Sequence, residues 1–359
     1  MSQYWSSLLS QLSPYVPGEQ RSGENIVKLN TNENPYPPSK QVIQAISDVD
    51  GTQLRRYPEP ASQSLRIALA QYHDLDAAQV FVGNGSDEVL ALAFMAFFTN
   101  AQPLVFPAIT YSFYPVYCKL YKIPFIELPM HDDFSIDWSG LPKQIGGIVF
   151  PNPNAPTGLA CSITHIENLL ANNPAKVVLI DEAYIDFGAQ SAVSLVDRYP
   201  NLLVTQTFSK GRSLAGMRIG AAFGHKDLIA GLDRVKNSFN SYPLDVVAEN
   251  AALASLQDES YHREHVNKII ASREWLIEQL EARDFDVLPS AANFVFAAPR
   301  HVSAKQLHLH LNSCDILVRY WDKPLLHDWL RISIGNADEL QQLISAIDQT
   351  QGLNGDDAL

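Results

Sequence analysis

The segment Thr207–Arg218 (TFSKGRSLAGMR) places a lysine and an arginine in a loop of small residues, directly after an apolar run at Leu202–Thr205. A flexible lysine loses side-chain entropy when it is ordered in such a loop. Near a cationic group in a partly desolvated pocket, a lysine has a lowered pKa and can act as a neutral nucleophile that forms a Schiff base. Arg218 suits an anion such as a phosphate and would help to lower that pKa. The segment thus favours a reactive Lys210, and a polar surface loop is the alternative.

A glycine-containing turn, Gly83–Glu88 (GNGSDE), lies between an apolar run and a predicted helix over Asp87–Phe98. Backbone N–H groups at the start of a helix can close on an anion. A dinucleotide-binding loop would carry a third glycine where Glu88 stands, and a carboxylate there would face the pyrophosphate. The turn therefore favours a cup for a single phosphate, with Ser86 and Asp87 at the helix start. A simple N-capped turn is the alternative.

A carboxylate and a tyrosine, Asp181 and Tyr184, follow the apolar run Val177–Ile180. The carboxyl end of a buried strand is where open α/β sheets bind ligands. Asp181 could keep a ring nitrogen protonated, and Tyr184 could donate to a phenolic oxygen.

Two further strand ends carry Thr110–Tyr114 (TYSFY) and Pro151–Gly158 (PNPNAPTG). The first offers an aromatic face that can stack on a planar ligand, and the second is a rigid polar turn that can present amides into a cleft. A core tyrosine and a structural turn are the common alternatives. Because all these features follow strands of one predicted sheet, we expect them to form one site.

The order of elements predicts an α/β fold with a mostly parallel sheet, because helices separate several of the apolar runs. After residue 243 a long helix is predicted over about 245–280, followed by strands of a smaller α+β domain. We expect an N-terminal arm at residues 1–38, a large domain at 39–243 and a small domain at 244–359. The predicted strands are Val80–Val82, Leu104–Phe106, Gly147–Phe150, Val177–Ile180, Leu202–Thr205, Ile219–Phe223, Phe285–Leu288, Asn293–Ala297 and Leu330–Ile334.

The composition of the 359 residues narrows the class of protein. A net charge of −13 argues against a nucleic-acid partner. No apolar run approaches the ~20 residues that cross a bilayer, and the N-terminus does not read as a signal peptide. The cysteines have no metal or disulfide spacing, which favours a reducing cytoplasm. The histidine pairs lack acidic ligands nearby, so no metal site is predicted; these pairs are His262/His265 and His308/His310.

Taken together, these segments resemble the fold type I aminotransferases that use pyridoxal 5′-phosphate, and among them the histidinol-phosphate aminotransferases. The resemblance covers nearly the whole chain. It is most specific at the lysine segment and moderately specific at the pair Arg319 and Arg331. The other segments that carry it are Pro14–Gly18, Lys28–Tyr36, Arg56–Pro58, Ile316–Arg319 and Leu330–Gly335.

The resemblance implies roles for individual residues. Lys210 would hold the cofactor as a Schiff base and then shuttle a proton. Asp181 would pair with the pyridine nitrogen, Tyr184 with the ring oxygen, and Tyr111 would stack on the ring. The phosphate of the cofactor would be held by Ser86, Asp87, Thr207, Ser209, Arg218 and, from a partner subunit, Tyr57. The substrate would be held by Arg331 at its carboxylate and by Arg319 and Tyr15 at its phosphate.

Two positions depart from the pattern of the family. Ala155 stands where an asparagine usually bonds the ring oxygen, so either Asn154 substitutes for it or Tyr184 acts alone. Arg319 is followed by Tyr320 and Trp321 rather than by a polar pair, which leaves the range of substrates open.

The expected reaction passes the amino group of L-histidinol phosphate to 2-oxoglutarate, giving imidazole acetol phosphate and L-glutamate in histidine biosynthesis. The nearest alternatives are an aromatic amino acid aminotransferase and an enzyme of a phosphorylated amine, such as a threonine-phosphate decarboxylase. A regulatory protein that binds the cofactor without catalysis is a further alternative. The resemblance also implies a homodimer with small-molecule substrates.

Overall fold

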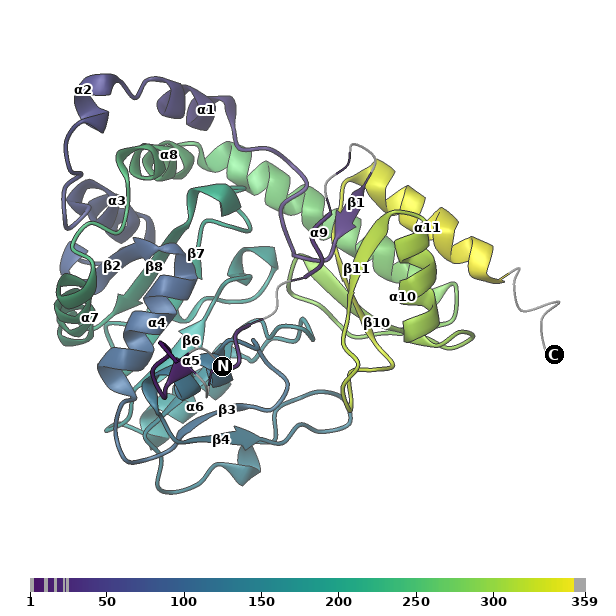
Figure 1. Ribbon diagram of the computed structural model, residues 1–359, viewed down its shortest axis with the longest axis horizontal. Coiled ribbons are helices and arrows are strands. Elements are labelled where there is room, and N and C mark those ends of the chain that lie inside the picture. Colours follow the sequence, from purple (N-terminus) through teal and green to yellow (C-terminus); the bar gives the residue numbers. More distant parts are fainter. Residues whose placement is uncertain (1–2, 10–11, 16–17, 22, 24–25, 352–359) are drawn as a thin grey trace.

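The computed structural model describes residues 3–9, 12–15, 18–21, 23 and 26–351. Val16 and Pro17 of the family-like segment near the N-terminus lie outside the described residues, as do residues 352–359 of the predicted small domain. The described chain forms a seven-stranded sheet and a five-stranded sheet, which helix α9 (Glu259–Glu281) connects (Figure 1). No helix in these ranges is long and apolar enough to cross a membrane.

The seven-stranded sheet has the order β2-β8-β7-β6-β5-β3-β4. Strand β8 is antiparallel to both neighbours, and the other neighbours are parallel. The α/β fold with a mostly parallel sheet is thereby confirmed. Strand β4 was missed because it is a short edge strand whose central residues are exposed. The strands are β2 (Val80–Asn84), β3 (Leu104–Pro107), β4 (Phe125–Leu128), β5 (Gly147–Pro151), β6 (Val178–Asp181), β7 (Leu202–Thr207) and β8 (Ile219–Gly224).

Helices cover both faces of this sheet, and alternate strand residues pack against each layer. Phe81 packs with the layer of α4, α5 and α7, whereas Val80 and Val82 pack with the layer of α3, α6 and α8. Helices α1 (Lys40–Ser47) and α2 (Gly51–Leu54) precede α3 along the chain. The two layers consist of α4 (Gly85–Phe97), α5 (Tyr114–Tyr121) and α7 (Lys226–Phe239), and of α3 (Gln63–His73), α6 (Ile163–Asn172) and α8 (Val246–Gln257).

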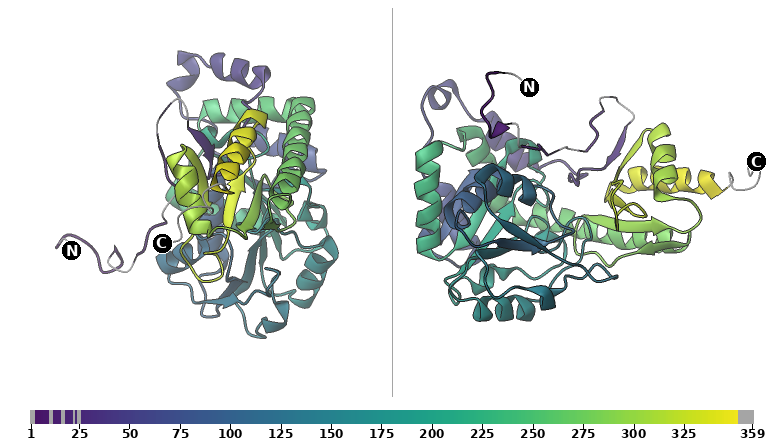
Figure 2. Two further views of the ribbon diagram at one scale, coloured as in Figure 1. Left: turned by 90° about the vertical axis from the view of Figure 1, so that its right-hand side faces the viewer. Right: turned by 60° about the horizontal axis from the view of Figure 1, so that its bottom comes forward.

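The five-stranded sheet combines strands from near both ends of the chain, because the N-terminal strand β1 pairs in parallel with the C-terminal strand β11 (Figures 1 and 2). The core against α9, α10 and α11 contains Val318 and Ile332. Strand alternation therefore places their neighbours Arg319 and Arg331 on the opposite face. The elements are β1 (Val27–Leu29), β9 (Phe285–Val287), β10 (Phe294–Pro299), α10 (Ala304–Ser313), β11 (Ile316–Tyr320), β12 (Leu330–Ser333) and α11 (Ala337–Gln351), in the sheet order β1-β11-β12-β10-β9.

The single helix predicted over 245–280 is wrong, because α8 ends and α9 begins at Asp258. The N–H of Asp258 donates to the carbonyl of Ala254, and its own carbonyl accepts from the N–H of His262. Aspartate suits such a junction because it favours caps over helix interiors. Helix α8 packs on α1 and α3, and α9 runs on to the five-stranded sheet. The division at residues 38/39 and 243/244 stays a prediction.

Candidate active site

A cavity of about 520 Å³ lies at the carboxyl ends of the parallel strands and reaches the five-stranded sheet. Parallel strands are expected to bind ligands at this edge. The structure brings most of the predicted site residues together there. The predicted residues that line it are Tyr15, Ser86, Asp87, Tyr111, Asp181, Tyr184, Thr207, Ser209, Lys210, Arg218, Arg319 and Arg331.

Lys210 lies in the loop after β7, where its Nζ donates to the carbonyl of Thr31 at 3.0 Å. Burial lowers the pKa of Lys210 to about 8, and the charge of Arg331 lowers it further against the opposing charges of Glu33 and Asp87. Arg218 contributes less than Arg331. The lowered pKa expected from the sequence is thus present, but its main electrostatic cause lies on the five-stranded sheet. At neutral pH a share of the amine is unprotonated and able to attack a carbonyl.

Asp181 ends β6 with only 4% of its surface exposed. Burial raises the pKa of Asp181 to about 6. Its hydrogen-bond donors are all neutral: the Tyr114 hydroxyl at 3.2 Å, the Ala183 N–H at 3.3 Å and the Thr205 hydroxyl at 3.4 Å. A buried carboxylate with neutral donors gains from a cationic partner, and a protonated ring nitrogen in the cavity would supply one.

The Tyr184 hydroxyl accepts a hydrogen bond from Asn32 Nδ2 at 3.0 Å. Burial raises the pKa of Tyr184, with the charge of Arg331 acting in the opposite direction. Asn32 has a φ of 57°, a backbone conformation that asparagine tolerates better than most residues, and its Oδ1 accepts from the Ser333 hydroxyl at 2.8 Å. Asn32 lies in the family-like segment Lys28–Tyr36, but no role was predicted for it. The available signal was its run of three asparagines, Asn30, Asn32 and Asn34.

At the start of α4 two glycines allow neighbouring groups to come close together, and they form a small concave site that we call the phosphate cup. Gly85 has a φ of +80°, and a Cβ there would lie 2.6 Å from Arg218 Nη2. A Cβ at Gly220 would collide with the Ser86 N–H. Both glycines therefore let a helix N-terminus and a guanidinium converge on one small space, which is the arrangement that binds phosphate.

The side chain of Asp87, which was predicted to help hold the phosphate of the cofactor, contacts other protein side chains instead. Its carboxylate accepts from Arg218 Nη2 at 3.1 Å and from the Tyr111 hydroxyl at 2.8 Å. A carboxylate has no donor for a phosphate, so any contact of Asp87 with an anion must come from its backbone N–H. The side chain instead orients Arg218 and Tyr111.

The opposite end of the cavity carries two guanidinium groups. Arg319 and Arg331 are direct partners in the antiparallel pairing of β11 and β12. The guanidinium carbons lie 5.3 Å and 5.4 Å, respectively, from the ring centre of Trp321, which sequence reasoning did not include in the site. Arg331 Nη2 donates to the Asn30 carbonyl at 2.8 Å, and its Nε is buried without a hydrogen-bond partner among the described residues. Like charges directly opposite across two strands repel, so this pair favours a bound anion.

Two predicted site residues do not line the cavity. The Asn154 amide instead donates to the Ile109 carbonyl at 3.0 Å and to the Thr157 hydroxyl at 3.1 Å, while Ala155 lines the cavity. Tyr57 is 82% exposed and stacks on Tyr242 at 4.7 Å. The predicted roles of both residues stay predictions.

The site defines an aminotransferase. Residues 24–347 match the family model for aminotransferase class I and II, and the chain belongs to this family. The chain is 52% identical over 347 residues to histidinol-phosphate aminotransferase 1 of Hydrogenovibrio crunogenus, covering 97% of this chain and 98% of that protein. It is 53% identical over 350 residues to histidinol-phosphate aminotransferase 1 of Burkholderia pseudomallei, with the same coverage. The resemblance predicted from the sequence is confirmed.

Solved structures show the same fold at lower identity. Histidinol-phosphate aminotransferase from Sinorhizobium meliloti, in complex with pyridoxal 5′-phosphate, has a TM-score of 0.88 at 24% identity and covers 98% of this chain and 99% of that chain. L-threonine-O-3-phosphate decarboxylase from Porphyromonas gingivalis has a TM-score of 0.78 at 20% identity, covering 91% of this chain and 100% of that chain. The fold alone therefore does not separate the two reactions.

Aminotransferases of this class use pyridoxal 5′-phosphate, and the cavity fits that group. The part of the cavity lined by Ser86 at the start of α4 and by Arg218 suits its phosphate, and the buried carboxylate of Asp181 suits its pyridinium nitrogen. Lys210, with its lowered pKa, suits the aldehyde. The phosphate site, the carboxylate and the amine lie at strand ends of one sheet, and they match the phosphate, the ring nitrogen and the aldehyde of pyridoxal 5′-phosphate.

Proposed function

We propose that this enzyme transfers the amino group of L-histidinol phosphate to 2-oxoglutarate, giving imidazole acetol phosphate and L-glutamate. Two relatives that are more than half identical to this chain are named histidinol-phosphate aminotransferase. The proposal rests on one observation in particular: Arg319 and Arg331 stand directly opposite each other across β11 and β12, and both line the same cavity as Lys210. Two such groups suit the phosphate of one substrate and the carboxylates of the other.

The cofactor supplies an electron sink for the carbanion formed when the substrate loses a proton from the carbon that bears its amine. Under this proposal Lys210 Nζ holds the cofactor and then moves that proton. Asp181 stays ionised and keeps the ring nitrogen protonated, and Tyr184 donates to the ring oxygen. Ser86, Thr207, Ser209 and Arg218 hold the phosphate of the cofactor together with the backbone N–H of Asp87. Asn154 stays a weaker candidate for the ring oxygen, because its amide is engaged in the turn.

Arg331 binds the carboxylate of the amino acid substrate, and Arg319 with Tyr15 binds the substrate phosphate. The ring of Tyr15 lies 4.8 Å from that of Phe113 and 6.4 Å from that of Tyr111. Tyr15 therefore lines the same cavity as Arg319 and stands beside Tyr111, the residue proposed to stack on the cofactor.

We propose a homodimer in the cytoplasm. The stacked pair Tyr57 and Tyr242 is followed back along the chain by two exposed apolar side chains, each three residues earlier: Leu54 is 61% exposed and Phe239 is 77% exposed. A second copy of the chain would cover them and would receive Tyr57 at its own phosphate cup. Free cysteines fit a reducing compartment.

The test is an assay of the purified enzyme loaded with pyridoxal 5′-phosphate. We expect turnover of L-histidinol phosphate with 2-oxoglutarate to exceed turnover of phenylalanine or tyrosine in kcat/KM. O-phosphothreonine should give no release of carbon dioxide. Faster reaction with an aromatic amino acid, or decarboxylation of phosphothreonine, would replace the proposed substrate by that alternative.

A further inference from the structure

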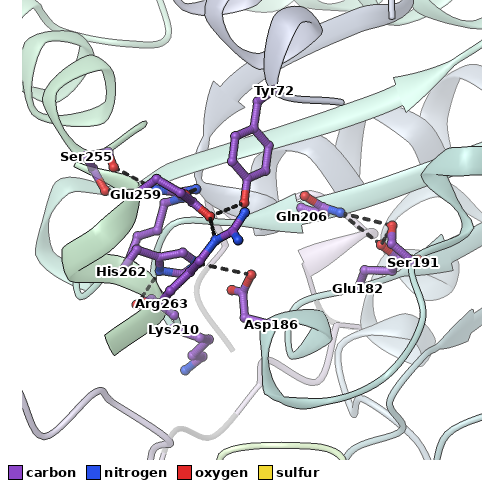
Figure 3. Close-up of polar contacts among 12 residues, drawn as sticks. Tyr72, Glu182, Asp186, Ser191, Gln206, Lys210, Ser255, Glu259, His262 and Arg263 are labelled. Carbon is purple, nitrogen blue, oxygen red and sulfur yellow. Dashed lines mark hydrogen bonds and ion pairs between the residues drawn. The ribbon is translucent and has the colours of Figure 1, made fainter. Parts of the chain in front are cut away.

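Behind Lys210, on the side away from the cavity, lies a cluster of polar side chains that the reaction described above does not use (Figure 3). It includes Asp186, Arg212, Glu259 and His262, and it draws on the loop after β6, the loop after β7 and the first turn of α9. In Figure 3 the side chain of Lys210 points away from Tyr72 and Glu259. The cluster therefore meets the lysine at its backbone, whereas the amine donates to the Thr31 carbonyl on another side.

Side chains hold the peptide units of Lys210 and Gly211 from two directions. Asn34 Nδ2 donates to the Lys210 carbonyl at 2.9 Å and to the Gly211 carbonyl at 3.2 Å. His262 Nδ1 lies 3.2 Å from the same Gly211 carbonyl. Because a carbonyl only accepts, the hydrogen must sit on His262 Nδ1. The backbone of the reactive lysine is thus held between the N-terminal segment and helix α9.

Gly211 has no room for a side chain at this point. A Cβ there would collide with the Asp186 carboxylate and would lie 2.9 Å from His262 Cε1. Asp186 and His262 therefore press directly against the residue that follows Lys210. A movement of either side chain would shift this peptide.

The second nitrogen of His262 faces a carboxylate. His262 Nε2 lies 3.6 Å from Asp186 Oδ1, and only 7% of the His262 side chain is exposed. Burial raises the pKa of Asp186, but the hydrogen bond and charge of His262 outweigh burial, with help from Arg212 and His73, and hold that pKa below its usual value. The imidazole ring of His262 is thus placed between the Gly211 carbonyl and the Asp186 carboxylate. The other charged pair of the cluster, Arg212 and Glu259, is joined at 3.1 Å.

We propose that His262, oriented by Asp186, is a positioning residue that fixes the Lys210–Gly211 backbone and so sets the direction of Lys210 Nζ. The inference rests on the proposed role of Lys210. The hydrogen bond from His262 Nδ1 to the Gly211 carbonyl carries the effect, and Asp186 acts through it by fixing the ring. A rigid lysine backbone matters because displacing a reacting group by about 1 Å can reduce a rate by on the order of a hundredfold.

The structure allows the two nitrogens of His262 to be tested separately. The amide of asparagine can stand in for Nδ1, and that of glutamine for Nε2. We expect His262→Gln to lower kcat about tenfold, with KM for histidinol phosphate changed less than about twofold, because the anion sites are untouched. His262→Asn should keep kcat within about threefold of the unaltered enzyme, because it keeps the bond to Gly211. His265→Asn is the matched control, because His265 Nδ1 donates to the Tyr261 carbonyl in its own helix rather than to the lysine loop.

A second readout does not depend on turnover. In the cofactor-free protein, labelling of Lys210 by an amine-reactive reagent can be followed against pH by peptide mass spectrometry. We expect a midpoint near pH 8 in the unaltered protein, in His262→Asn and in His265→Asn. In His262→Gln a mobile lysine is better solvated, so the midpoint should rise by about half a unit or more. This readout tests the inference even if histidinol phosphate is not the substrate.

Asp186→Asn provides an independent variant should His262→Gln fail to fold, as judged by circular dichroism. It keeps the shape of the side chain and removes the charge that orients His262. We expect kcat to fall about threefold with KM unchanged. The inference is overturned if His262→Gln or Asp186→Asn matches the unaltered enzyme in both readouts. It is equally overturned if His262→Asn loses as much as His262→Gln.

Discussion

The two ends of the cavity are built in different ways. The deep end stands on the seven-stranded sheet, where Asp181 and Lys210 follow neighbouring parallel strands. The mouth stands on the five-stranded sheet, where Arg319 and Arg331 meet across antiparallel strands. At the deep end burial shifts the pKa values of Asp181 and Lys210 toward neutrality. At the mouth burial lowers the pKa of Arg331 as well, and two guanidinium groups stand directly opposite each other.

We expect the two ends to have different functions: proton transfer at the deep end and substrate binding at the mouth. Groups whose pKa values lie near neutrality can exchange protons, and every substrate needs that step. Paired guanidinium groups bind anions, and substrates differ in the anions they carry. Changes at the deep end should therefore lower kcat for all substrates, and changes at the mouth should alter the preference among them.

The largest effect is expected from Lys210→Ala at the deep end. One group holds the cofactor and moves the proton, so nearly all turnover should disappear for every substrate. The cofactor should still bind through its phosphate, which absorbance during dialysis would show. Undiminished transamination by this variant would contradict the assignment of Lys210.

Asp181→Asn should lower kcat by on the order of a hundredfold or more, equally for histidinol phosphate and glutamate. A neutral amide cannot stabilise the positive charge on the ring nitrogen, although it fits the same buried space. Rapid-mixing measurements of each half-reaction would show this. Normal half-reaction rates would mean that another group holds that proton.

Arg319→Ala should show that a change at the mouth alters the preference among substrates, unlike a change at the deep end. Losing a charge-assisted contact to a phosphate in a desolvated site costs on the order of 2–5 kcal/mol. We expect kcat/KM for histidinol phosphate to fall about a hundredfold or more, and that for phenylalanine to change far less. Arg331→Ala is the comparison variant and should harm glutamate most. Equal losses for both substrates in Arg319→Ala would remove the support for a phosphate site.

Lys210→Met should stabilise the cofactor-free protein. The pKa of Lys210 is lowered from 10.5 to about 8, so the unfolded chain binds more protons between these values and stability rises with pH across that window. Below pH 8 the full cost of the buried charge remains. At pH 7 the variant should therefore gain on the order of 1–3 kcal/mol of unfolding free energy in urea, and the rise between pH 8 and 10.5 should vanish. Identical urea curves at pH 7 would show that Lys210 is well solvated.

The smallest effect is expected from Ala155→Asn. The new amide would face the cavity and could bond the ring oxygen of the cofactor, as in most of the family. Activity should stay within about threefold, and the pH titration of the visible absorbance of the bound cofactor should shift. A variant that does not fold would show that the turn packs too tightly for an amide, since Ala155 is 6% exposed.

The sequence predicted the deep end better than the mouth. Apolar runs that end in polar residues located Asp181, Tyr184 and Lys210, because parallel strands bring their carboxyl ends to one edge. The contribution of Arg331 to the pKa of Lys210 was not predictable, since it depends on how two sheets face each other. The strand register that places Arg319 directly opposite Arg331 could not be predicted either, because the number of residues between them does not determine which residues of two strands pair.

The contacts of Asn32 and Asn34 were missed for a similar reason. They come from a segment that was predicted to be an arm, and the only strand among its described residues is the three-residue strand β1. Such a strand has no detectable period and is held by its pairing with β11. The break between α8 and α9 was missed because both flanking segments favour helix.

The parallel pairing of β1 with β11 has a consequence for the order in which the protein is made. Asn32 bonds Ser333, 301 positions later, so its place beside Tyr184 is set by one of the last strands to leave the ribosome. The carbonyl of Thr31 that receives the Lys210 amine depends on the same strand pairing. Contacts this distant in sequence form slowly and late. A nascent or truncated chain that lacks β11 and β12 therefore has a lysine without its final surroundings, and the amine acquires its unusual reactivity only when synthesis is nearly finished.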